Sequence, residues 1–195
     1  MPQIYFLDRD PMLAAQYHMD THCSTMIVEH AVLLSTVHRL LDGNQHGTLP
    51  DSRDKVLYQT RVQYKDHPVT DWVKSNVDNY RWLHDHLHFL IGEYRYRYGN
   101  MPHAAERLLP YLLDAPYNIH IDDIADLPII DMLVDTPYDL LPMIPPPQCV
   151  PEECKREDFV EAYRDYYINK LGHLGSWVIR GKPPWWQDGV WQYDQ

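Results

Sequence analysis

Two long stretches of the sequence place apolar residues at helical spacing, and they limit the fold more than any other feature. In residues 12–41, Ile27, Leu34 and Leu41 share one face at about 100° per residue. Residues 70–98 repeat the pattern and end at Gly99-Asn100, a common helix terminus. The sequence therefore predicts a mainly α-helical protein built on two long helices.

The rest of the chain predicts shorter pieces around these two helices. Residues 44–68 are polar and loop-like, and shorter helical patterns cover about 104–113 and 157–171. At 195 residues the chain is long enough for one compact domain. We expect a helical body over 1–114, an excursion over 115–152, and a C-terminal helix with an aromatic tail over 153–195.

The excursion is rich in proline and acid. The chain carries a formal charge of -11, and seven of its acids lie between Asp114 and Asp139 without a Lys or Arg among them. Eight prolines between residues 116 and 151 exclude a long helix there. Three interpretations stay open: a surface linker, a lid over a cleft, or an acidic surface that imitates DNA.

Composition indicates the compartment but no activity. Three cysteines form a sparse, odd set, which fits a reducing cytoplasm better than a disulfide framework. We see neither a leader pattern nor an apolar run of about 20 residues, and therefore expect a cytoplasmic protein without a membrane partner. The negative charge weighs against non-specific binding to nucleic acid, although much of it lies in the excursion.

A polar stripe on the first long helix could carry chemistry. Steps of four, three and four residues bring His18, His22, Thr25 and Glu29 to one side of the helix. Two histidines and a carboxylate could bind a divalent metal, or act as general acid and base. The competing interpretation is an ordinary solvated helix face.

The second long helix has a comparable flank beside its apolar face. If the two helices pair, the two stripes could line one groove, in which an exposed indole would stack a nucleobase. The ordinary alternative is a set of border residues with surface contacts. The residues of this flank are Ser75, Asn79, Trp82, His86, Glu93 and Arg97.

The C-terminal region interleaves aromatic and cationic residues. Arg164 stands in a tyrosine-rich helix, and Trp185-Trp186 follows a Lys-Pro-Pro sequence. Such a mixture can stack bases and contact phosphates, while the alternative is a tail that folds back onto the core. We expect this tail to meet a DNA strand.

Several motifs are missing from the sequence. It contains neither a Gly-x-Gly-x-x-Gly nor a Walker-type loop, and it lacks a Gly-x-Ser-x-Gly elbow. Cys149 and Cys154 are not in a zinc spacing, and the acidic segment does not match a calcium loop. We therefore expect no cofactor.

Short sequence blocks are spread over nearly the whole chain: Leu7-Asp8-Arg9-Asp10-Pro11, Ala14-Ala15-Gln16-Tyr17-His18-Met19-Asp20-Thr21-His22, Met26-Ile27-Val28-Glu29, His67-Pro68, Trp72, Ser75, Asn79-Tyr80-Arg81-Trp82-Leu83, Glu93-Tyr94, Arg97-Tyr98, Tyr163-Arg164-Asp165-Tyr166-Tyr167 and Pro183-Pro184-Trp185-Trp186. In combination these blocks resemble a family of uncharacterised tailed-bacteriophage proteins. The chain departs from that family at Thr21 and Thr25, where basic residues are usual.

The layout also resembles phage pyrimidine-dimer DNA glycosylases, which are all-helical and use an N-terminal amine with a glutamate. In this chain Asp20 or Glu29 would take the place of that glutamate, and loss of the initiator Met would leave the secondary amine of Pro2. Phages that hypermodify thymine also encode transferases that place amino acids on activated 5-hydroxymethyluracil in DNA. The resemblance implies a phage protein in an infected bacterial cytoplasm.

These observations lead to a hypothesis with two alternatives. We expect an enzyme acting on pyrimidine bases in DNA, by amino-acid transfer or a glycosylase-like reaction, with DNA and an amino acid or other small molecule as partners. Asp20, His22 and Glu29 would be catalytic. His18, the six residues of the second flank, Arg164, Trp185 and Trp186 would bind substrate. The alternatives are an acidic anti-defence protein that imitates DNA, and a metal-dependent enzyme using His18, His22 and Glu29.

Overall fold

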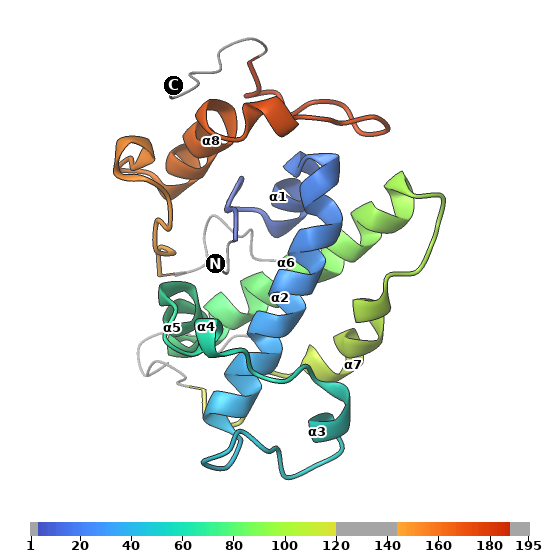
Figure 1. Cartoon of the computed structure of the whole chain (residues 1–195), viewed down its shortest axis with the longest axis vertical. Helices are drawn as coiled ribbons and strands as arrows, with labels where there is room; N and C mark the ends of the chain where they lie inside the picture. The colour runs from blue at the N-terminus through green and yellow to red at the C-terminus, as the bar shows by residue number, and fades with distance from the viewer. Residues whose placement is uncertain (1–3, 120–143, 188–195) are drawn as a thin grey trace, which may run out of the picture.

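The computed structural model describes residues 4–119 and 144–187, and within these ranges the chain forms helices and no strands (Figure 1). The predicted mainly α fold is confirmed. None of the described helices is long and apolar enough to span a membrane. Most of the acidic segment and the residue Pro2 lie outside the described residues, so the interpretations placed on them stay predictions.

Two long helices, α2 (Asp20–Leu41) and α6 (Val77–Arg97), lie against each other at the centre of the molecule (Figure 1). Both contribute leucines and isoleucines to one buried cluster. The short helices α1 (Pro11–Tyr17) and α5 (Pro68–Ser75) also pack on α6. α6 is therefore covered on several sides, which decides how much of its polar flank remains exposed.

Each long helical pattern of the sequence is divided in two. The first breaks at His18 and Met19, whose ψ angles of 134° and 156° are extended. The second breaks at Asn76, whose side chain caps α6 by accepting the backbone N–H of Asp78 at 2.6 Å. His18 therefore precedes α2, and Ser75 belongs to α5 instead of α6, so neither residue continues the polar stripe predicted for its long helix.

The loop predicted for residues 44–68 contains two single-turn helices, α3 (Arg53–Val56) and α4 (Val62–Lys65). Arg39, from the end of α2, fixes this loop. Its buried guanidinium donates to the backbone oxygens of Gly47, Asp54, Leu57 and Tyr58 and pairs with the Asp54 carboxylate at 2.6 Å. The loop is held against α2, so that α4 lies beside the middle of that helix.

The N-terminal segment joins the helical body to the C-terminal region. Residues 4–7 are buried and belong to no helix, and the Phe6 ring lies 4.8 Å from Trp82 and 5.4 Å from Tyr163 between ring centroids. Tyr163 belongs to α8 (Phe159–Asn169), which crosses the body near α1 (Figure 1). The remaining short helices are η1 (Ala104–Leu108), α7 (Leu109–Leu112), η5 (Glu152–Cys154) and η6 (Gly172–Leu174).

Candidate functional site

Glu29 and His22 lie two turns apart on the side of α2 that faces α4 and α8. The Tyr64 hydroxyl, from α4, donates a hydrogen bond to Glu29 Oε2. The backbone oxygen of Tyr64 in turn accepts from the hydroxyl of Thr70 at 2.5 Å, which fixes the tyrosine. Glu29 is half-buried, so its carboxylate is both oriented and reachable. We call His22, Thr25 and Glu29 the α2 face.

His22 is held by two tyrosines. Its Nδ1 lies 2.6 Å from the hydroxyl of Tyr167, a fully buried residue of α8. The Tyr5 ring stacks on the imidazole, with centroids 4.9 Å apart and planes 9° from parallel. Burial lowers the pKa of His22 to about 4, because a charged imidazole loses its hydration there. His22 is therefore neutral at pH 7.

Behind the α2 face lies a cluster of three fully buried histidines. His30 Nδ1–H donates to the Met26 oxygen at 2.7 Å, which leaves its Nε2 to accept from His86 Nδ1–H at 2.9 Å. His18 Nδ1–H donates to the Ala14 oxygen at 2.7 Å. The backbone carbonyls thus place the proton of neutral His18 and His30 on Nδ1. Burial, the largest effect, lowers the pKa of all three imidazoles, that of His30 to about 3.

The buried histidines, which include His38 of α2, make the protein sensitive to acid. An unfolded histidine takes up a proton near pH 6.5, whereas folded His22, His30 and His38 do so only near pH 4 or below. Between these values the unfolded chain binds more protons, so stability falls as the pH falls, by about 1.4 kcal/mol per pH unit for each such histidine. We expect urea unfolding at pH 7, 6 and 5 to show a steep loss.

The control for this measurement is His88→Gln, because His88 is exposed on α6. This variant should show the same steep dependence on pH as the unchanged chain. Equal free energies of unfolding at pH 7 and pH 5 would contradict the burial of neutral histidines.

The metal set of the second alternative does not assemble. Among the described residues no group of three or more His, Cys, Asp or Glu side chains is arranged to hold an ion. The break before α2 removes His18 from the stripe and buries it, while the side chains of His22 and Glu29 are bonded to Tyr167 and Tyr64. The structure therefore does not bring His18 together with His22 and Glu29 as a set of metal ligands.

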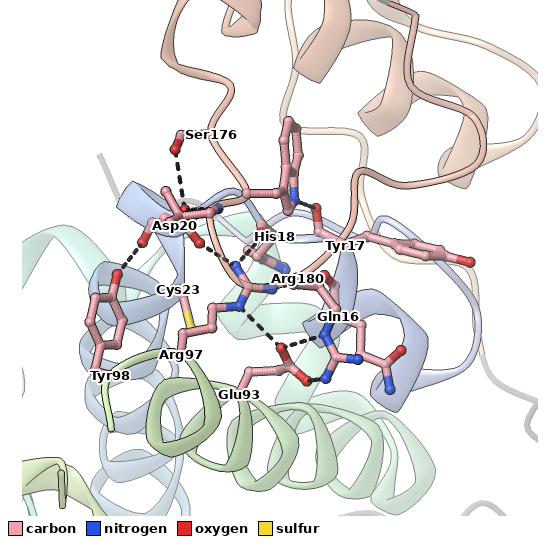
Figure 2. Close-up of polar contacts among 12 residues, drawn as sticks. Gln16, Tyr17, His18, Asp20, Cys23, Glu93, Arg97, Tyr98, Ser176 and Arg180 are labelled. Carbon is pink, nitrogen blue, oxygen red and sulfur yellow. Dashed lines mark hydrogen bonds and ion pairs between the residues drawn. The ribbon is translucent and has the colours of Figure 1, made fainter. Parts of the chain in front are cut away.

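A second polar group forms at the C-terminal end of α6, around Arg97 (Figure 2). Its guanidinium donates to the backbone oxygens of His18 at 2.6 Å and Gln16 at 2.9 Å, and pairs with Asp20 and Glu93, each at 3.1 Å. The Arg97 side chain is 1% exposed. It thus binds the two carbonyl groups that the break between α1 and α2 leaves free.

The C-terminal segment attaches to the same group (Figure 2). Arg180 donates to both oxygens of Glu93, and Asp20 Oδ2 accepts from the Val178 backbone at 2.8 Å and the Ser176 hydroxyl at 3.2 Å. We call Asp20, Glu93, Arg97 and Arg180 the clamp. Asp20, predicted to be catalytic, lies in the clamp, where its carboxylate holds Arg97 and the C-terminal segment.

The predicted wall of the second helix is not an open surface. Trp82 is 1% exposed and donates its indole N–H to the Arg9 oxygen at 2.6 Å, so it offers no exposed ring for stacking. Asn79 and His86 are fully buried, and Glu93 and Arg97 belong to the clamp. Ser75 is half-buried and bonded within α5 and to Asn79. The helices α1, α2 and α5 all pack on α6, and together they cover the flank that was predicted to lie exposed beside its apolar face.

The aromatic tail folds back onto the body. Trp185 lies 5.9 Å from Tyr17 between ring centroids, and the Arg164 guanidinium lies 5.2 Å from the Trp185 ring. Trp186 packs at 4.6 Å on Trp177. Arg164 also pairs with Asp8 at 2.8 Å. The cation expected to meet phosphate is therefore neutralised, although both tryptophans remain half-buried.

The tyrosines of the site have no local signal in the sequence. Tyr5, Tyr64 and Tyr167 orient His22 and Glu29, but they come from the N-terminal segment, a single-turn helix and α8. Only the spacing on α2 carried a local signal. Aromatic residues from three distant segments become neighbours through tertiary packing alone.

No protein-family model matches the chain, and comparisons with curated proteins and with solved structures find no significant match.

Proposed function

We propose that the protein is an enzyme that acts on a pyrimidine base of DNA, with its chemistry at the α2 face. The observation that carries the proposal is the pair formed by the reachable Glu29 carboxylate and the neutral His22 imidazole. They are two turns apart, about 10 Å along the helix axis. Tyrosines 5, 64 and 167 contact this pair and hold its groups in place.

The hydrogen bonds define what each group can do. In the proposed arrangement the Tyr167 hydroxyl donates its proton to His22 Nδ1, which lies 2.6 Å away. His22 then carries its proton on Nε2 and is a neutral donor, suited to a carbonyl oxygen on which negative charge develops. It is not a general acid at pH 7, because burial depresses its pKa.

Glu29 is the group suited to accept a proton. In the proposed reaction the incoming nucleophile, an amine or water, gives its proton to the Glu29 carboxylate as it bonds to the substrate carbon, and the leaving group departs with the bonding electron pair. Tyr64 orients the carboxylate by its hydroxyl hydrogen bond. Amino-acid transfer to an activated 5-methylene and cleavage of the glycosidic bond both follow this scheme.

The choice of DNA as substrate draws on the resemblance to tailed-phage proteins, whose blocks include both His22 and Glu29. Phage origin and a place in the bacterial cytoplasm are parts of the same proposal. The acidic-mimic alternative uses the segment from Asp114 to Asp139, of which only residues 114–119 are described. It differs in one respect that can be tested, since an inhibitor does not need Glu29.

The test uses oligonucleotides that contain thymine, 5-hydroxymethyluracil, its phosphorylated form, or a cyclobutane dimer, each incubated with the protein and a mixture of amino acids. Nucleosides are then analysed by mass spectrometry. An amino-acid adduct identifies a transferase, and a released base or an abasic site identifies a glycosylase-like reaction. Unchanged nucleosides in every arm would overturn the proposal.

A further inference from the structure

The segment that carries Tyr64 to Glu29 also carries two exposed cations. Arg61 directly precedes α4 and Lys65 ends it, and both side chains are exposed. Arg61 is close enough to lower the pKa of the Tyr64 hydroxyl against the larger, raising effect of burial. Both cations thus lie next to the group that orients the carboxylate.

These two cations differ from those of the aromatic tail. Arg164 is paired with Asp8 and Arg180 with Glu93, so their charges are used inside the protein. Within the described part of the chain neither Arg61 nor Lys65 takes part in an ion pair. In a protein of charge -11, they are free to meet an anion.

The surface around them is hollowed on both sides. A hollow of about 390 Å³ lies between Val28 and Val32 of α2 and the residues from Tyr58 to Arg61. A second, of about 290 Å³, is lined by Lys65 and His46 and shares Gln59 and Thr60 with the first. One cation therefore lines each hollow, and polar side chains connect them.

We propose that residues 58–65, the strand-binding edge, hold the phosphate backbone of the DNA strand whose base reaches Glu29. Arg61 and Lys65 would each contact one phosphate, while the Thr60 hydroxyl and the Gln59 amide supply further hydrogen bonds. This inference rests on the proposed function, because it requires DNA as the ligand. It moves the binding surface from the tail, where the sequence placed it, to the loop beside α2.

The expected contribution is limited by nearby acids. Asp66 follows Lys65 and is exposed, and Glu29 lies beyond Tyr64, so the edge carries two separate cations rather than a broad basic patch. Binding should be weak at physiological salt and should strengthen as salt is lowered. Each phosphate contact on a single strand adds about 0.7 to the slope of log K against log salt.

The experiment measures the binding of a fluorescent, thymine-containing single strand by anisotropy between 25 and 200 mM salt. Three full-length proteins are compared: the unchanged chain, Arg61→Gln/Lys65→Gln, and Arg107→Gln/Lys155→Gln. The third protein loses two exposed positive charges outside residues 58–65, so it has the same net charge as the edge variant and serves as its control. Circular dichroism verifies that all three are folded.

We expect the edge variant to reduce the salt slope by about 1.4 and to weaken binding more than tenfold at 25 mM salt, while the control keeps the slope. The inference would be overturned if the edge variant and the control variant had the same affinity and the same salt slope. It would also be overturned if the edge variant kept the salt slope of the unchanged chain but had a raised KM for an amino-acid co-substrate, because the two cations would then bind that co-substrate. A chain that does not bind DNA at all would also overturn it. Nucleoside conversion is measured in addition, at saturating DNA. If DNA is converted but the edge variant binds it as the unchanged chain does, only this inference fails; if neither protein converts DNA, the proposed function fails.

Discussion

Replacing Arg97 by methionine is expected to lower the free energy of unfolding by about 3–5 kcal/mol, because it leaves buried charges without their partner. Arg97 is paired with Glu93 and Asp20 and binds the carbonyl groups of His18 and Gln16. Methionine keeps much of the side-chain volume, so the loss reports the charge and the hydrogen bonds. Urea unfolding of the full chain measures it.

The matched control is Arg95→Met, two residues earlier on α6. Arg95 pairs with Glu106 at 2.8 Å at the surface, where both side chains are about one-third exposed. Its replacement should cost less than about 1 kcal/mol. Equal losses for the two variants would show that the clamp does not join α1, α2, α6 and the C-terminal segment as described.

Replacing Glu29 by glutamine is expected to reduce kcat by about 100- to 10,000-fold, the range for loss of a general base. Glutamine has the same shape and can still accept the Tyr64 hydrogen bond, so the fold should persist. Steady-state conversion of the reactive oligonucleotide measures the effect. The control is Glu157→Gln, which removes one exposed carboxylate just before α8 and should leave kcat unchanged.

Two results would contradict this assignment. Full activity of Glu29→Gln would remove the carboxylate from the chemistry. A comparable loss of kcat in Asp20→Asn, at undiminished thermal stability, would return the catalytic role to Asp20. The clamp instead predicts that Asp20→Asn acts on stability, since Asp20 accepts bonds from Ser176 and Val178.

Local sequence pattern predicted the helices but not the break between α1 and α2. Residues 12–41 are helical throughout by periodicity, and the break becomes stable because Arg97, far along the chain, satisfies the exposed carbonyl groups. That partner is invisible locally. The break at Asn76 had a readable signal, because an asparagine before Val77 and Asp78 is a favoured N-cap.

The candidate site likewise combines features that local sequence predicts with features that only tertiary packing determines. The spacing of His22 and Glu29 on one helix face follows from 3.6 residues per turn, and both lie on that face in the structure. The flank containing Trp82 and Asn79 has the same local pattern, yet it is buried because α1 and α5 cover α6 in addition to α2. A border position cannot be assigned to surface or core until the number of packed neighbours is known.

The most direct test of the central claim compares the nucleosides of pyrimidine-containing DNA after incubation with the unchanged chain and with Glu29→Gln, at equal concentrations of folded protein. We predict that the unchanged chain yields a new nucleoside mass or a missing base, and that the variant leaves the DNA unaltered. Identical nucleoside composition in both samples, whether unaltered or equally converted, would contradict the account.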